Sequence, residues 1–175
     1  MLRIAIVIVA ALMCPPPAWP AAERAPASAA IEVIAALAPA VEATAAATRP
    51  RHWPMKRACL YYALAGQALL ARHGIATRLR LGRVVYRPGT AAAHPIAPHA
   101  WLESATHFID YAALPRWGQV AIIPTPMTAA AVAVVAPGST RVLAIPDAPD
   151  VRLWRDLSHH RRCFQGRWRA WQRDG

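Results

Sequence analysis

Cys59, His99 and Asp110 have the side chains of a thiol nucleophile, a base and an acid that orients the base. A catalytic cysteine needs a nearby base to take its proton, and the base needs an acceptor that orients it. His99 and Asp110 both lie in the segment PHAWLESATHFIDYA, residues 98–112. Cys59 stands in the first turn of a predicted helix, and a helix N-terminus favours the thiolate form of a cysteine. The three residues therefore predict a Cys-His-Asp triad.

The spacing of His99 and Asp110 fits two strands of a tight hairpin. The segments HAWLES and THFIDYA are typical of strands, with a turn around Ser104 and Ala105. A turn centred there places His99 opposite Asp110 on one face of the hairpin, ~5 Å apart at Cβ. This arrangement brings the imidazole and the carboxylate within reach of a hydrogen bond.

Other interpretations of these residues stay open. A single cysteine in an apolar helix more often packs in the core than acts as a nucleophile. His94 falls in a predicted Pro-rich loop, and His107 has the opposite strand parity from Asp110, so both are weaker candidates for the base. Glu103 is expected at a solvated edge near the turn, and Trp101 over the site or in the core. A solvated face is also expected for three arginines: Arg78, Arg80 and Arg83.

The sequence predicts no cofactor and no metal site. His159 and Cys163 are one helical turn apart in a predicted helix, but two ligands alone are weak evidence for a metal. The cysteines are odd in number and widely spaced, which does not fit a disulfide framework.

The elements around the candidate triad predict an α+β fold. One or two short helices are expected over residues 30–48, broken at Pro39, and a longer helix from Met55 to His73 that ends at Gly74. The alternating segment IATRLRLGRVVYRP predicts a strand, and VAIIP, AAVAVVAPG and TRVLAIP predict further short strands. A last helix is expected to begin near Asp150. Its apolar, largely aromatic stripe is expected to pack on the sheet and comprises Trp154, Leu157, Phe164, Trp168 and Trp171.

A chain of 175 residues has room for one catalytic domain. Residues 1–29 carry a short apolar run followed by prolines and small residues, which predicts a signal peptide and a periplasmic or secreted location. Without that cleavage the protein would be cytoplasmic. We expect an Ala/Pro-rich helical lead-in over 30–54, a catalytic core over 55–149 and a basic amphipathic helix over 150–175.

The formal net charge is +11, and 19 of the 20 basic residues are arginine, which is typical of a GC-rich genome. No run rich in Lys or Arg and interleaved with aromatics precedes the last 25 residues, which argues against nucleic-acid binding. The expected partner is a peptide or protein substrate. A weak contact between the last helix and an anionic membrane surface is a further hypothesis.

Two stretches of the chain resemble the transglutaminase-like cysteine peptidase superfamily: CLYYALAGQALLARHGIATRLRLGRVVY and HAWLESATHFID. The resemblance covers residues 52–112. It is shared with lasso-peptide leader peptidases and with bacterial periplasmic transglutaminase-like cysteine peptidases, although the latter place Gly-Asp where this chain has Arg57 and Ala58. It implies a papain-like core in which a nucleophile helix packs on an antiparallel sheet.

The same resemblance implies a role for each residue of the triad. Cys59 is the nucleophile, His99 the general base and Asp110 its orienter. The backbone N–H of Cys59 is an oxyanion donor. The position of Trp53 and His52, just before the predicted helix, makes either side chain a candidate to assist it. The chain is thus expected to be a cysteine-dependent peptidase or acyltransferase acting on a peptide amide. The alternative is a non-catalytic envelope binding or scaffold protein that retains the fold.

Overall fold

The computed structural model describes residues 27–53, 58–124, 128–129, 142–146 and 157–174, and it has the predicted α+β architecture. Its six-stranded sheet has the order β4-β3-β2-β1-β6-β5, and all neighbours are antiparallel except β5 and β6. The helices are α1 (Ala27–Ala36), α2 (Ala38–Thr48), α3 (Cys59–Arg72), the short α4 (Leu114–Trp117) and α5 (Leu157–Asp174), with a 3-10 turn at Tyr111–Ala113. The strands are β1 (Arg78–Tyr86), β2 (His94–Glu103), β3 (His107–Asp110), β4 (Ala121–Pro124), β5 (Thr128–Ala129) and β6 (Val142–Pro146).

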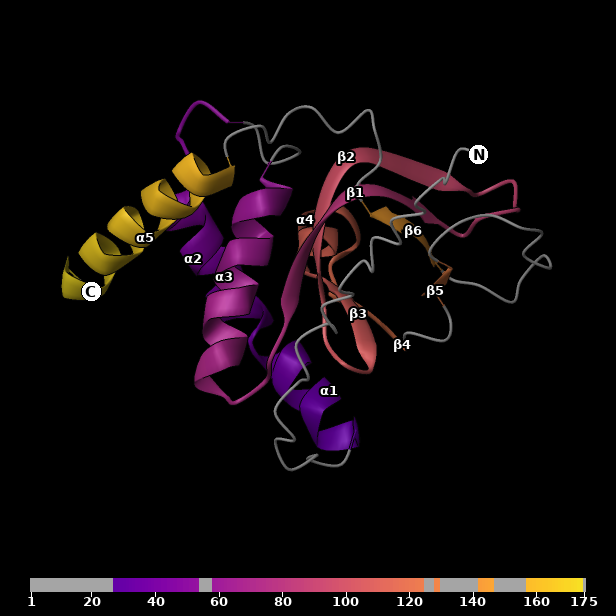
Figure 1. Cartoon of the computed structure of the whole chain (residues 1–175), viewed down its shortest axis with the longest axis horizontal. Coiled ribbons are helices and arrows are strands. Elements are labelled where there is room, and N and C mark those ends of the chain that lie inside the picture. Colours follow the sequence, from indigo (N-terminus) through magenta and orange to yellow (C-terminus); the bar gives the residue numbers. More distant parts are fainter. Residues whose placement is uncertain (1–26, 54–57, 125–127, 130–141, 147–156, 175) are drawn as a thin grey trace, which may run out of the picture.

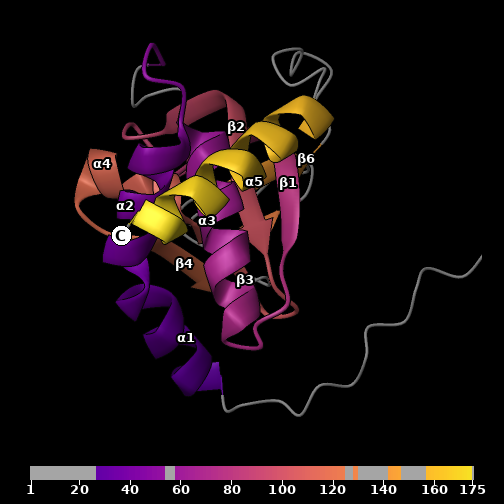
Figure 2. The ribbon, with the colours of Figure 1, turned by 90° about the vertical axis from the view of Figure 1, so that its left-hand side faces the viewer.

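The helices α2, α3 and α5 gather on one side of the sheet, with α5 outermost (Figures 1 and 2). The larger apolar core lies between α3 and the sheet and includes Leu60, Leu70, Leu102 and Ile109. A smaller core on the other face of the sheet comprises Val84, Tyr86, Trp101, Phe108, Ile123, Val142 and Ala144. The sheet is therefore covered by apolar packing on both faces.

Helix α3 is the central helix of the fold. The helix predicted from Met55 to His73 is described from Cys59 to Arg72, and residues 54–57 lie outside the described part. It ends as predicted at Gly74, whose φ of 72° is left-handed, and the Ile75 N–H donates to the Leu70 carbonyl at 3.0 Å. Its N-terminal half is buried almost completely, which fixes the first turn against the rest of the protein.

The helix pair before α3 agrees with the predicted break at Pro39. Helix α1 ends at Ala36, and Pro39 lies in the first turn of α2, where a missing N–H costs no helical hydrogen bond. No single described helix is long and apolar enough to cross a membrane. The bent pair Ser28–Ala36 and Ala38–Thr48 passes that test by length and composition. Its residues Ile34, Val41 and Ala45 are buried in the core of this fold.

The β2–β3 hairpin differs from its predicted register by two residues. Leu102 pairs with Ile109, and Ser104 donates its N–H to the His107 carbonyl at 2.9 Å, so the turn is centred one residue later than predicted. The Ser104 hydroxyl accounts for the shift, because it accepts the His107 N–H at 2.9 Å and closes the turn itself. A shift of two residues keeps every side chain on its face. His99 and Asp110 thus become diagonal neighbours on the same face.

Strand β2 also begins earlier than predicted. His94, expected in a loop, pairs with Tyr86, and Pro95 pairs with Val85. Proline is tolerated there because β3 pairs only with the last two residues of β2, so the first half of β2 has β1 on one side alone. Gly82 sits at a register irregularity in β1, where a Cβ would lie 2.0 Å from the Ile145 carbonyl oxygen of β6.

Helix α5 packs on α2 and α3 and not on the sheet, which corrects the prediction for its aromatic stripe (Figure 2). The reason is that α2 and α3 already cover that face of the sheet. Phe164 is buried and Trp168 is half-buried, whereas Trp171 is 42% exposed. Asp150 and Trp154 lie outside the described residues, as does the whole of the predicted strand AAVAVVAPG.

Candidate active site

Cys59 is the first residue of α3, as the triad hypothesis requires. The carbonyl of Ala58 accepts the N–H groups of Tyr61 and Tyr62 at 2.8 and 3.0 Å, which starts the first turn. The thiol is reduced, and the side chain is buried with 4% exposure. Cys59 therefore stands at a helix N-terminus, where unpaired backbone N–H groups and the helix dipole favour negative charge.

His99 and Asp110 are in direct contact. Nε2 of His99 lies 2.7 Å from Oδ2 of Asp110, and their side chains are only 2% and 1% exposed. The other carboxylate oxygen, Oδ1, accepts the backbone N–H of Ala112 at 2.8 Å. The contact is diagonal across the hairpin, so the predicted pair is brought together by a register other than the predicted one.

Tyr86, the last residue of β1, is a third partner of Asp110 that the sequence analysis missed. Its hydroxyl donates to Oδ2 of Asp110 at 2.5 Å, on the same oxygen that faces His99. Burial raises the pKa of Tyr86 well above its ordinary value, and the charge and hydrogen bond of Asp110 add to the rise. No spacing in the sequence points to this contact, because β1 and β2 change register between Gly82 and Val84.

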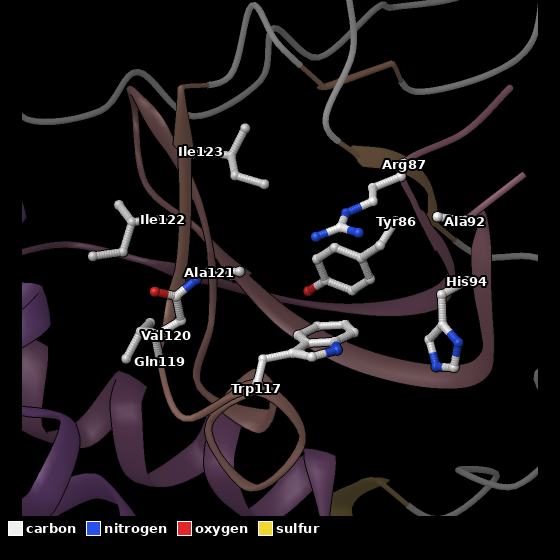
Figure 3. A pocket seen from close by; sticks show the side chains of 10 residues that line it. All are labelled: Tyr86, Arg87, Ala92, His94, Trp117, Gln119, Val120, Ala121, Ile122 and Ile123. Atoms are coloured by element: carbon white, nitrogen blue, oxygen red, sulfur yellow. The ribbon is translucent and has the colours of Figure 1, made fainter. Parts of the chain in front are cut away.

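The ring of Tyr86 forms part of the wall of a cavity of about 920 Å³ on the side away from α3 (Figure 3). Trp117 packs edge-on against that ring with centroids 4.6 Å apart, and His94 packs against Trp117 at 5.9 Å. The remaining lining residues are Arg87, Ala92, Gln119, Val120, Ala121, Ile122 and Ile123. His94 thus lies at this cavity and not at the triad.

The protonated form of His99 is favoured where it lies. Burial lowers the pKa of His99, but the charge and hydrogen bond of Asp110, with a further contribution from Cys59, raise it from 6.5 to about 10. Among the described residues, Nδ1 of His99 has no partner within normal hydrogen-bond geometry. The Cys59 thiol is nevertheless near enough to the ring to raise the pKa of His99. Because Asp110 occupies Nε2, Nδ1 is the nitrogen left to exchange a proton with the thiol. Such contacts are often long before substrate binds.

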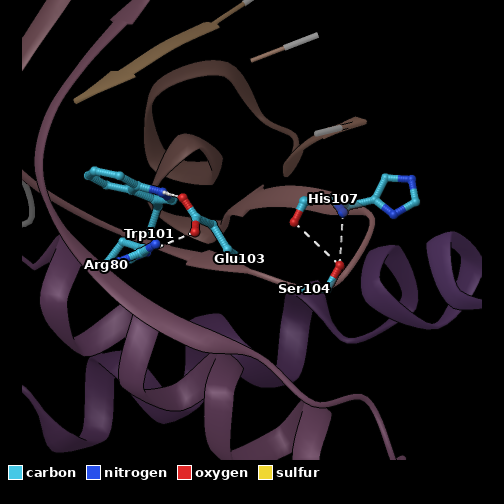
Figure 4. Close-up of polar contacts among 5 residues, drawn as sticks. All are labelled: Arg80, Trp101, Glu103, Ser104 and His107. Carbon is cyan, nitrogen blue, oxygen red and sulfur yellow. Dashed lines mark hydrogen bonds and ion pairs between the residues drawn. The ribbon is translucent and has the colours of Figure 1, made fainter. Parts of the chain in front are cut away.

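Glu103 and Trp101 support the wall behind His99. Glu103 is partly exposed, as expected, but it does not lie at an edge, because it pairs with Arg78 of β1 and with Phe108 of β3. Oε1 of Glu103 accepts the indole N–H of Trp101 at 3.2 Å, and Oε2 accepts Nε of Arg80 at 2.8 Å (Figure 4). The indole ring stacks on His99 at 15° with centroids 6.4 Å apart. Arg80 is partly exposed, as a solvated face would require, and it also neutralises the acid that holds the Trp101 indole.

His107 is the first residue of β3 and lies at the turn of the hairpin, beside Ser104 (Figure 4). It is buried, and its Nδ1 lies 2.8 Å from the hydroxyl of Thr106. Its backbone and Ser104 close the turn, so its described contacts are structural. The strand-parity argument against His107 as the base agrees with this placement.

An aromatic cluster joins α5 to the segment that precedes the nucleophile helix. Trp53 packs edge-on against Tyr61 at 5.7 Å and lies 5.1 Å from the ring of His160 in α5. His52 is exposed. The expectation that Trp53 or His52 assists the oxyanion stays a prediction. The part played by His160 was not visible in the sequence, because no local pattern links residues so far apart.

Within the described ranges, no group of three or more His, Cys, Asp or Glu residues is arranged to hold a metal ion. His159 and Cys163 are in contact, with Nε2 and Sγ 3.4 Å apart, on the partly exposed side of α5. The expected absence of a cofactor stays a prediction.

A family model described as transglutaminase-like superfamily matches residues 2–120 of the chain. The match contains Cys59, His99 and Asp110. It also contains residues 1–29 almost completely, for which the signal peptide stays a prediction. Searches of curated proteins and of solved structures find no match.

Proposed function

Because the chain belongs to the transglutaminase-like superfamily, whose members are often cysteine enzymes, we propose that it is a cysteine-dependent peptidase or acyltransferase. The proposed substrate is a peptide amide, and the proposed catalytic residues are Cys59, His99 and Asp110. The observation that carries this proposal is the buried imidazole of His99, held by Asp110 at 2.7 Å on Nε2 and interacting with the Cys59 thiol.

Each residue has a defined task in the proposed reaction. The Cys59 thiolate attacks the amide carbonyl carbon, and the backbone N–H of Cys59 donates to the oxygen that becomes negative. Protonated His99 gives its proton to the leaving amine as the C–N bond breaks, which leaves a thioester on Cys59. Water or a second amine then attacks the thioester carbonyl and passes a proton to His99, and the C–S bond breaks, so that Cys59 leaves as the thiolate. Asp110 keeps the imidazole in the orientation that both transfers need.

The substrate class can be narrowed by product analysis. The resemblance to lasso-peptide leader peptidases favours the leader of a precursor peptide, whereas the resemblance to periplasmic peptidases favours an envelope protein. We propose a peptide or protein substrate in either case. Incubation with a peptide library, followed by mapping of new amino termini and of incorporated dansylcadaverine, separates hydrolysis from transamidation. Cys59→Ser is the matched inactive control.

The first experiment measures the reactivity of Cys59 without a known substrate. The rate of alkylation by iodoacetamide is followed from pH 5 to 10 in a protein that carries Cys14→Ser and Cys163→Ser, with and without His99→Ala. An activated Cys–His pair reacts rapidly near pH 6, where an ordinary thiol of pKa ~8.5 is almost wholly protonated. His99→Ala then removes the fast reaction at low pH. A thiol that is slow near pH 6 and indifferent to His99 would refute the enzyme and favour a non-catalytic scaffold.

A further inference from the structure

We propose that Tyr86 is a positioning residue of the active site: its hydroxyl holds the carboxylate of Asp110 in the orientation that aligns His99. The proposal rests on the proposed function, because it assigns a fourth member to the same site. It adds β1 to the elements that build the site, since the three residues of the triad come from α3, β2 and β3.

The hydrogen bonds of Asp110 show what Tyr86 contributes. The carboxylate is buried with 1% exposure. Oδ1 has the Ala112 N–H as a donor, and Oδ2 has His99 and Tyr86. Without Tyr86, Oδ2 would keep only the movable imidazole as its side-chain partner. With Tyr86, one oxygen is fixed between two strands, and the direction in which it faces Nε2 of His99 is set independently of His99.

Tyr86 is itself held firmly enough to act as a support. Its ring packs edge-on against Trp117 at 4.6 Å and against Phe108 at 6.4 Å. The ring lines the cavity (Figure 3). The hydroxyl at its end donates to Asp110. The raised pKa of Tyr86 means that the hydroxyl keeps its proton, and a carboxylate can only accept. Tyr86 is therefore the donor in this bond.

The experiment uses Tyr86→Phe, which removes the hydroxyl and keeps the ring. The primary readout is the proton NMR signal of the His99 Nε2–H, measured in the full chain carrying Cys59→Ala. In the parent that proton is expected far downfield and slow to exchange with water, because it bonds a buried carboxylate. In Tyr86→Phe we expect it to move upfield and exchange faster. An unchanged or further downfield signal overturns the proposal.

Two further variants separate positioning from general destabilisation. Tyr111→Phe is the matched control, because its buried hydroxyl donates to the Ile34 carbonyl at 2.9 Å and not to Asp110. It should lower stability without moving the His99 signal, and an equal movement in Tyr111→Phe overturns the proposal. If Tyr86→Phe fails to fold, Trp117→Ala decides. Trp117 is 44% exposed, and its loss should loosen Tyr86 and move the signal in the same direction. An unmoved signal there overturns the proposal.

A second readout connects Tyr86 with reactivity. In the background with Cys59 as its only cysteine, Tyr86→Phe should slow alkylation near pH 6 by about ten-fold, the scale on which supporting hydrogen bonds affect a site. Tyr111→Phe should leave that rate near the parent value. The NMR result judges Tyr86 even if the parent thiol is slow, so failure of the proposed function and failure of this inference are distinguishable.

Discussion

Replacing Gly66 by alanine is expected to lower the free energy of unfolding, although the same change normally stabilises a helix. Gly66 lies in the middle of α3, where alanine would gain about 1 kcal/mol over glycine from helix propensity alone. An added Cβ, however, would lie 2.6 Å from Cδ2 of Tyr111 and 3.1 Å from Cδ1 of Leu102. Tyr111 is 1% exposed and is tied through its hydroxyl to α1, so its ring has little room to move.

The balance of these two effects gives the size of the change. Overpacking of a well-filled core costs about 1–3 kcal/mol, which exceeds the gain in propensity. We therefore expect Gly66→Ala to lower the stability by about 1 kcal/mol, which corresponds to a decrease of about 2–4 °C in Tm for a chain of this size. Tyr111 follows Asp110 directly, so a displaced ring should also disturb the triad and slow Cys59 alkylation.

Gly166→Ala in α5 is the matched control, because a Cβ there would meet nothing within 4 Å. It should stabilise the protein by up to about 1 kcal/mol. Urea unfolding followed by tryptophan fluorescence gives both free energies under one set of conditions. If Gly66→Ala is as stable as Gly166→Ala, the close packing of α3 on Tyr111 is refuted.

Three further predictions follow from the site. Asp110→Asn should leave the chain folded but slow turnover by about 10²–10⁴-fold, because the amide no longer holds the same imidazole tautomer and orientation; circular dichroism and a peptide assay check this, and near-normal turnover contradicts it. The free energy of unfolding should fall as pH rises from 6.5 to about 10, because the pKa of His99 is raised in the folded state. The stabilisation from protonated His99 is complete below pH 6.5 and is lost progressively up to about pH 10. Urea titrations of Cys59→Ala should show this slope, and the double variant Cys59→Ala/Asp110→Asn should show a flatter one. Glu103→Ala should cost about 1 kcal/mol, because the Trp101 N–H loses its acceptor while the half-exposed ion pair with Arg80 is screened; a Trp101 fluorescence spectrum identical to the parent would contradict the assigned contact.

The sequence was most informative where chemistry and local geometry coincide. The helix that ends at Gly74, the break at Pro39 and the strand pair carrying His99 and Asp110 each have a short-range signal: a left-handed glycine, a missing N–H and two strand-like segments on either side of a short polar turn. The contact between His99 and Asp110 was predicted correctly although the predicted register of the hairpin was wrong, because a shift of two residues keeps every side chain on its face of the sheet. A shift of one residue would have separated the pair.

The features that were missed depend on contacts between distant segments. The Tyr86 hydroxyl reaches Asp110 through a sheet whose register changes inside β1, and no local pattern reveals such a change. Glu103 was expected in solvent, but an indole N–H and a guanidinium from the neighbouring strand satisfy its carboxylate. The prediction that α5 packs on the sheet was wrong, because amphipathicity shows that one face of a helix is buried but does not show which surface covers it.

The placement of α5 has a consequence for the order in which the protein acquires reactivity during synthesis. Arg167 of α5 donates to the Thr48 carbonyl at 2.9 Å, and His160 packs on Trp53, so α5 holds both ends of the segment 48–53. Cys59, His99 and Asp110 emerge from the ribosome well before α5. In the nascent chain, segment 48–53 therefore lacks its contacts with Arg167 and His160. We expect the thiol to reach its full reactivity only after α5 has docked, which would protect the ribosome-bound chain from its own chemistry.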